Sequence, residues 1–160
     1  MAFTAQYESP LGSIVLASDG EALTGLRFGA VETPVSAGDV PALAETCRWL
    51  DIYFSGQQPL FFPPLNPAGT AFRQRVWQAL MEIPYGATTT YGAIARHIGC
   101  RSAQAVGQAV GSNPVAIIVP CHRVVGSDGA LTGYAYGVER KEYLLQLEAG
   151  RLASAATASR

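Results

Sequence analysis

The sequence has few charged residues, few residues that bind metals, and no long hydrophobic run. Charged side chains make up 14% of the 160 residues and hydrophobic ones 49%, which predicts a globular chain and argues against disorder. No apolar run approaches the about 20 residues that span a bilayer. The N-terminus lacks the basic start and apolar stretch of a signal peptide. We therefore expect a cytoplasmic chain that forms one compact unit or two small lobes.

Cysteine and histidine are too sparse for a zinc site. The three cysteines are scattered, at Cys47, Cys100 and Cys121, and the two histidines are His97 and His122. Their spacing matches no zinc motif, so no metal is expected. An odd number of separate thiols is typical of a reducing compartment.

The small net charge of −1 hides an uneven distribution. Residues 1–70 carry two arginines against seven acidic residues, a net of −5. Residues 71–111 carry four arginines against one glutamate, a net of +3. Because the local field decides binding more than the sum does, the basic segment leaves a nucleic-acid partner open.

The pattern of turns and apolar residues predicts an α+β fold. A small N-terminal lobe at residues 1–68 is expected to hold a three-stranded antiparallel sheet, with strands at residues 3–7, 13–18 and 23–28. A helix is expected at residues 41–54, followed by a linker with four prolines at residues 59–67.

Residues 69–149 are predicted to form a mostly helical C-terminal domain. One helix starts after Thr70, and two short helices follow around a glycine turn, with caps at Thr88–Thr90 and Ser102. This spacing predicts a helix-turn-helix. A hairpin is expected at residues 124–131 and a flexible loop at residues 133–137. A closing helix is expected at residues 139–148, followed by a flexible tail at residues 150–160.

Cys121 stands between Pro120 and His122, directly after the apolar run 115–119. Because that run predicts burial, the thiol is either a packed small residue or a nucleophile. Pro120 can start a helical turn, whose positive end would favour the thiolate. Adjacent side chains seldom face each other, so His122 is expected to act on the thiol through water.

For other candidate residues, a purely structural role is the alternative to a functional one. Glu148 can orient the imidazole or be a solvated helix end. Arg123 is better explained as a structural ion pair. Asn113 fits a plain helix stop before Pro114 as well as it fits a functional role. Tyr91 fits a core or surface aromatic equally well.

The helix-turn-helix pattern is also compatible with plain helix packing. The second helix, residues 103–110, carries mainly Ala and Gly, with Gln104 and Gln108 as its only long polar side chains. Small side chains let a backbone approach closely, which suits the minor groove of DNA. A major-groove reader would carry more long polar side chains.

Several motifs together resemble the O6-alkylguanine-DNA alkyltransferase family, the methylated-DNA–protein-cysteine methyltransferases. They cover residues 70–149 in order and include Phe72-Arg73-Gln74-Arg75-Val76-Trp77, Ile83-Pro84-Tyr85-Gly86, Asn113-Pro114, Pro120-Cys121-His122-Arg123-Val124 and Leu131-Thr132-Gly133-Tyr134. The N-terminal lobe resembles the family more loosely, through residues 9–12 and the three strands.

The resemblance implies irreversible, single-turnover repair of double-stranded DNA. A monomer would bind the minor groove, flip the alkylated guanine (and O4-alkylthymine) into a pocket and move the alkyl group to Cys121, without a cofactor. Carried over by position, Cys121 is the nucleophile, His122 its base through water and Glu148 the group that orients His122. Asn113 supports the local backbone, and Tyr91 helps to neutralise the guanine.

The resemblance also implies which residues contact the nucleic acid. The expected DNA-binding residues are Tyr91, Arg101, Gln104, Ala105, Gly107 and Gln108. The expected pocket residues are Val124 (through its backbone), Tyr134, Ala135 and Tyr136.

Two positions depart from the family pattern. Gln104 stands where an arginine usually fills the gap left by the flipped base, and Tyr136 where many members have glycine. The alternative function is therefore an alkyltransferase-like protein that binds lesions with weak or no transfer, although such proteins lack the cysteine. A cysteine hydrolase would need an oxyanion hole, for which no glycine motif surrounds Cys121.

Overall fold

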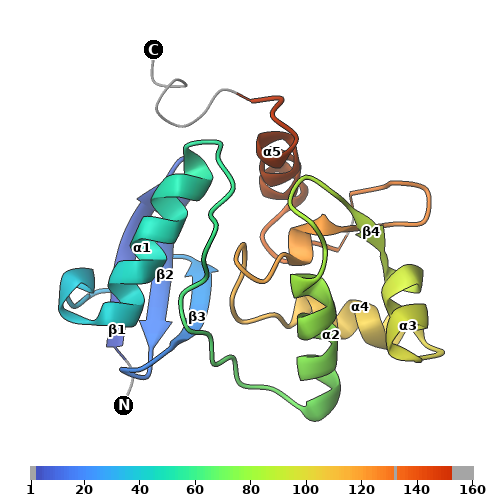
Figure 1. Ribbon diagram of the computed structural model, residues 1–160, viewed down its shortest axis with the longest axis horizontal. Helices are drawn as coiled ribbons and strands as arrows, with labels where there is room; N and C mark the ends of the chain where they lie inside the picture. The colour runs from blue at the N-terminus through green and yellow to red at the C-terminus, as the bar shows by residue number, and fades with distance from the viewer. Residues whose placement is uncertain (1–2, 132, 153–160) are drawn as a thin grey trace.

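Two lobes of different architecture follow one another along the chain (Figure 1). The computed structural model describes residues 3–131 and 133–152. The first lobe carries a sheet and one long helix, and the second is built mainly of short helices. The predicted α+β fold class is confirmed.

The sheet of the first lobe is the predicted antiparallel meander. Its strands, in the order β1-β2-β3, are β1 (Phe3–Ser9), β2 (Gly12–Ser18) and β3 (Leu23–Phe28). Gly12, the first residue of β2, and Gly20, in the turn before β3, have φ of 113° and 103°, a region that side chains disfavour. The turn signals in the sequence therefore set the strand ends.

Helix α1 (Pro41–Phe54), preceded by the short 3-10 helix η1 (Ala37–Asp39), packs against this sheet (Figure 1). Pro41 suits the first turn, where its missing N–H has no partner to lose. Leu43, Leu50 and Tyr53 are fully buried on the inner face of the helix. This spacing is the helical period predicted from the sequence.

The outer edge of β3 joins the first lobe to the rest of the chain. Leu23 N–H donates to the carbonyl of Pro64 at 2.7 Å, inside the proline-rich linker. Leu26 N–H donates to the carbonyl of Pro114 at 2.9 Å, in the second lobe. The linker is thus held by backbone hydrogen bonds. The division of the chain at residue 68 stays a prediction.

The described part of the second lobe has four α-helices, α2 (Ala71–Met81), α3 (Tyr91–Ile98), α4 (Ala103–Gly111) and α5 (Val138–Glu148). Two of the four begin at the predicted caps, Thr90 and Ser102; Thr70 caps a third, and α5 follows Gly137 without a side-chain cap. The hydroxyls of Thr70, Thr90 and Ser102 each accept from the backbone N–H three residues on, at 3.2, 3.1 and 3.0 Å. Gly99, left-handed with φ 74°, ends α3. Helices α3 and α4 form the predicted helix-turn-helix.

The predicted hairpin at residues 124–131 is wrong. Strand β5 (Val124–Val125) pairs in parallel with the distant β4 (Thr89–Thr90). Both valines are buried, so their backbone groups need a partner inside the protein. The following turn is real, since Gly126 N–H donates to Ala130 O at 2.9 Å, but it leads to no returning strand.

The apolar run before the cysteine forms a buried turn. Residues 115–119 are at most 2% exposed, and Ile117 adopts φ 70°, which a β-branched residue rarely does. The run ends at the 3-10 helix η2 (Cys121–Arg123). Cys121 is 7% exposed, so the run carries the thiol into the interior as predicted.

The C-terminal part contains the predicted closing helix, α5. The tail predicted from residue 150 falls largely outside the described residues, as does Thr132 of the Leu-Thr-Gly-Tyr motif. Among the described residues, no helix combines the length and apolar character needed to span a membrane.

Candidate active site

Cys121 lies at a narrow cavity between the end of α4 and the loop at residues 133–137. The cavity leaves only about 10 Å³ free. Its lining consists of Val110, Gly111, Asn113, Cys121, Gly133, Tyr134, Ala135 and Tyr136. Three of the four predicted pocket residues line it. Val124, expected to act through its backbone, does not line it and pairs with Thr89 of β4 instead.

Asn113 fixes the turn that carries the cysteine. Its Nδ2 donates to Val119 O at 2.8 Å, and its Oδ1 accepts from Val115 N–H at 3.0 Å. The amide thus satisfies backbone groups on both sides of the strained Ile117.

The buried carboxylate of Glu148 forms hydrogen bonds with three side chains. Its Oε2 lies 2.6 Å from His122 Nε2, and its Oε1 accepts from Arg123 Nε at 2.7 Å. Oε2 also accepts from the Tyr53 hydroxyl at 2.6 Å. Glu148 is therefore a buried partner of His122, and Arg123 forms the ion pair expected of it.

Burial and charge set the protonation states here. Burial raises the pKa of Cys121, against the smaller opposite effects of Asn113 and Lys141. The expectation that the turn after Pro120 favours the resting thiolate is thus corrected, because η2 is only three residues long and burial outweighs it.

His122 and Glu148 are shifted in complementary ways. Burial lowers the pKa of His122, although Glu148 acts in the opposite direction. Burial alone would raise the pKa of Glu148, but the hydrogen bonds and charges of His122 and Arg123 bring it down to about 2. Near pH 7 the carboxylate is therefore ionised, and burial favours the neutral form of the imidazole.

The orientation of His122 leaves one ring nitrogen for chemistry. Within the described residues, its buried Nδ1 has no hydrogen-bond partner. With Glu148 at Nε2, the neutral ring carries its proton there and has a lone pair on Nδ1. The site therefore contains a buried thiol and a base held by a carboxylate.

Two residues that act on Cys121 or on its neighbour His122 were missed by sequence reasoning. Lys141 of α5 is the only lysine of the chain and is fully buried; burial lowers its pKa, and the Cys121 charge acts in the opposite direction. Tyr53 reaches the site from the first lobe. Lys141 lies among charged neighbours in α5, so nothing in the sequence indicated its burial, and Tyr53 was indistinguishable from a core aromatic.

The predicted DNA-binding residues gather on the helix-turn-helix. A surface hollow of about 600 Å³ is lined by Tyr91, Ala103, Gln104, Gly107, Gln108 and Gly133. Gly133 also lines the cysteine cavity, so the two spaces meet there. Arg101 and Ala105 lie on the same turn and helix outside this lining. A Cβ at Gly133 would lie 2.9 Å from the Tyr91 hydroxyl, so a side chain would crowd this junction.

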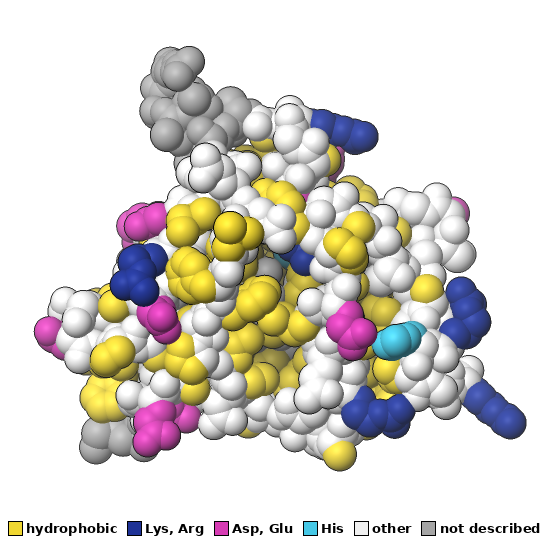
Figure 2. Space-filling model, in the orientation of Figure 1, with side chains coloured by type: hydrophobic (Ala, Val, Ile, Leu, Met, Phe, Trp, Pro, Cys, Tyr) yellow, Lys and Arg dark blue, Asp and Glu magenta, His cyan; other side chains and the backbone are white. Residues whose placement is uncertain are grey.

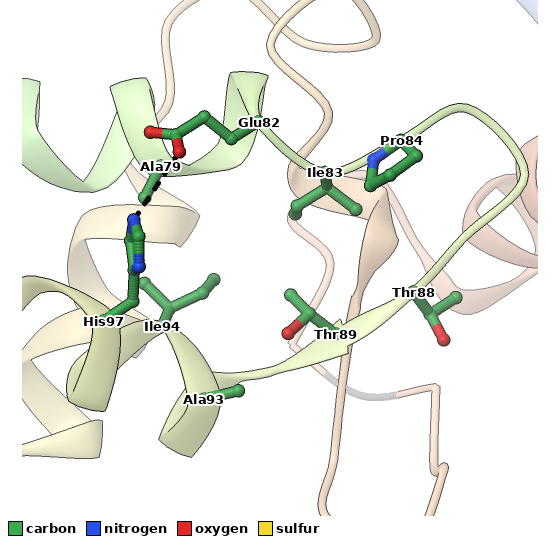
Figure 3. Close-up of a pocket in the computed structure, with 9 residues that line it drawn as sticks. All are labelled: Ala79, Glu82, Ile83, Pro84, Thr88, Thr89, Ala93, Ile94 and His97. Carbon is green, nitrogen blue, oxygen red and sulfur yellow. Dashed lines mark ion pairs between the residues drawn. The ribbon is translucent and has the colours of Figure 1, made fainter.

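Two of the hollows that lack the thiol lie beside α2. One, of about 380 Å³, lies between α2 and α3, where His97 faces Glu82 at 3.6 Å (Figure 3). The other, of about 230 Å³, is lined by Trp49, Phe62, Met81 and neighbouring side chains between the lobes, where hydrophobic side chains gather (Figure 2). In residues 3–131 and 133–152, no cluster of His, Cys, Asp and Glu could hold a metal.

The charges of the two lobes are segregated as the sequence indicates. Acidic side chains predominate over the first lobe, and Lys and Arg side chains over the α2–α3 side (Figure 2). The cavity at the thiol meets the hollow of the helix-turn-helix, an arrangement typical of a cysteine-dependent DNA alkyltransferase.

Comparisons with known proteins identify the family. Two family models match, the DNA binding domain of 6-O-methylguanine DNA methyltransferase at residues 71–150 and its ribonuclease-like domain at residues 3–67. The chain belongs to the 6-O-methylguanine DNA methyltransferase family, and the resemblance inferred from its motifs is confirmed.

Individual relatives agree over nearly the whole chain. The methylated-DNA–protein-cysteine methyltransferase of Methanosarcina acetivorans is 48% identical over 152 residues, which cover 91% of this chain and 97% of the relative. That of Mycobacterium leprae is 48% identical over 146 residues, 88% of each chain. The crystal structure of Mycobacterium tuberculosis OGT in complex with DNA superposes with a TM-score of 0.85, at 44% identity and 97% coverage of both chains.

Proposed function

We propose that this chain repairs DNA by moving an alkyl group from O6 of guanine to Sγ of its own Cys121. The S–C bond forms as the C–O6 bond breaks. The thiol loses one proton, and guanine leaves as the neutral keto base with one proton gained. Because a thioether does not return the alkyl group, each protein molecule acts once. The observation that supports this best is the position of Cys121, in a cavity that meets the helix-turn-helix hollow at Gly133.

The buried thiol needs a base, because burial raises the pKa of Cys121. His122 fits this role, since its pKa is lowered and its Nδ1 has no partner among the described residues. A water molecule between Nδ1 and Sγ would carry the proton, as expected for adjacent side chains. Glu148 holds the ring so that Nδ1 is the nitrogen that accepts.

The helix-turn-helix hollow is suited to the minor groove. Ala103 and Gly107 offer little steric bulk on α4, so the helix backbone can approach DNA closely. Gln104 is exposed there and can occupy the gap left by a flipped base, although without a charge. Tyr91 lies between this surface and the cavity, where its hydroxyl can donate to guanine N3 as the leaving group forms.

A flipped base needs more room than the cavity now offers. About 10 Å³ is at most the roughly 10–15 Å³ of such space that a single water needs, far less than a base needs. Tyr134 and Tyr136 must therefore move for a base to enter. Their loop runs between Gly133 and Gly137, both at positive φ, 76° and 100°, where the backbone has more freedom than elsewhere.

The test is the mass of the intact protein after incubation with duplex DNA containing O6-methylguanine. We expect a gain of about 14 Da, one methylene equivalent, per chain. Cys121→Ala should abolish the gain, whereas Cys100→Ala, a thiol beside the helix-turn-helix, should keep it. A duplex with O4-methylthymine tests the second lesion. Binding of lesion DNA with no change in mass would refute transfer and favour a lesion-binding protein.

A further inference from the structure

Tyr53 belongs to the first lobe, yet its hydroxyl is part of the proton-handling cluster in the second. It is fully buried on α1. Its hydroxyl donates to Oε2 of Glu148 at 2.6 Å and lies 3.5 Å from Nε2 of His122. Two donors, the phenol and the imidazole, thus meet the same carboxylate oxygen.

Aromatic packing fixes this hydroxyl in place. The Tyr53 ring stacks on Trp49 with centroids 5.1 Å apart and an interplanar angle of 11°. It meets Phe54 and Tyr85 edge-on at 5.3 and 6.3 Å. Because the ring is enclosed on these sides, the O–H group reaches Glu148 without a loss of side-chain freedom at the moment of reaction.

We propose that Tyr53 is a positioning residue for alkyl transfer. Its hydrogen bond to Oε2 holds Glu148 ionised and keeps the imidazole proton on Nε2. The Nδ1 atom of His122 is then left to accept the thiol proton. The proposal rests on the function proposed above. It makes the first lobe a direct contributor to the chemistry of Cys121.

The charges around the cluster indicate the direction of the effect. Glu148 faces His122, Arg123 and Tyr53, and the backbone N–H of Gly86 at 3.4 Å; the Tyr85 phenol feels its charge without a hydrogen bond to it. Burial lowers the pKa of His122, Glu148 raises it, and Arg123 and Lys141 lower it. Without the phenol, the Glu148 charge is shared by fewer donors and attracts His122 more strongly. The imidazolium is then favoured, and less free base is present at a given pH.

Tyr85 provides a matched control. It is a neighbouring tyrosine in edge contact with Tyr53, but its buried hydroxyl has no hydrogen-bond partner within the described residues. Tyr85→Phe and Tyr53→Phe therefore remove the same atom from the same aromatic cluster. Only Tyr53→Phe removes a donor from Glu148.

The experiment is the single-turnover rate of methyl transfer from O6-methylguanine duplex DNA, measured between pH 5.5 and 9. For Tyr53→Phe we expect the acid limb to move up by about one pH unit, a loss of about tenfold below neutrality, with rates that meet the wild type at high pH. Tyr85→Phe should follow the wild type, and the DNA affinity of both variants should be unchanged. An unshifted profile, or an equal loss at every pH, would overturn the proposal.

Side-chain NMR gives a second measurement that needs no DNA. The chain has only two histidines, so His97→Gln assigns their signals. We expect His122 to carry its proton on Nε2 in the unreacted protein and Tyr53→Phe to raise its midpoint of titration. An unchanged midpoint would refute the role of Tyr53. If the wild type transfers no methyl group while the midpoint shifts, the proposed function fails and the effect of Tyr53 on His122 stands.

Discussion

Replacing Arg123 by methionine should destabilise the protein strongly, because it leaves a buried carboxylate without its permanent counter-charge. The guanidinium donates to Glu148 at 2.7 and 3.1 Å and to the carbonyl of Ile83 at 2.8 Å. The Glu148 side chain is 0% exposed. Breaking a buried pair on one side typically costs about 3–5 kcal/mol, a large share of the roughly 5–15 kcal/mol that folds a small domain.

Urea unfolding at pH 7, followed by tryptophan fluorescence, measures this cost. The matched control is Arg48→Met, which removes an exposed pair, Arg48 with Glu45 at 3.6 Å, and should cost less than about 1 kcal/mol. The double variant Arg123→Met/Glu148→Met should be more stable than Arg123→Met alone, because no charge is then left unpaired. An Arg123→Met loss no larger than that of Arg48→Met would refute the reasoning.

Three further predictions concern acid stability, DNA binding and the size of the pocket. The pKa of Glu148 in the folded protein, about 2, lies below its ordinary 4.5. Its stabilising effect is therefore complete above pH 4.5 and is lost as the pH falls toward 2. Glu148→Gln should flatten this part of a stability–pH curve, whereas Glu45→Gln should not. Gln104→Arg should tighten binding to lesion duplexes several-fold at low salt, with a steeper salt dependence, in a titration by fluorescence anisotropy; equal affinity would contradict the role given to Gln104. Tyr136→Gly should raise the rate with O6-benzylguanine relative to O6-methylguanine, because a ring lining the cavity is removed; an unchanged ratio of the two rates would show that Tyr136 does not limit the pocket.

The caps and turns of the fold could be predicted because they depend on neighbours in sequence. Thr70, Thr90 and Ser102 each satisfy an N–H three residues away. Gly12 and Gly20 supply positive φ where the strands turn. Such contacts involve only residues close together in sequence, so the meander and the helix starts follow from the local pattern.

The pairing of β4 with β5 could not be predicted in this way. Ser127–Gly129 is a genuine turn signal, but Val124 and Val125 find their partners at Thr89 and Thr90. A local pattern gives no information about which distant segment completes a buried backbone. The hairpin prediction failed because burial, which is a tertiary property, chose the partner.

The sequence by itself determined the family and the identity of the candidate nucleophile, because the Pro-Cys-His-Arg motif, the upstream Asn113 and the apolar run place a thiol beside an imidazole in the interior. The family resemblance also named Glu148 as the group that orients His122, whereas only the tertiary structure showed that Arg123 and Tyr53 hold the same carboxylate. Glu148, Arg123 and Tyr53 meet from three separate elements, with Tyr53 and Glu148 95 residues apart. Buried charges must find partners wherever the fold brings them, and no spacing rule along the chain contains that information.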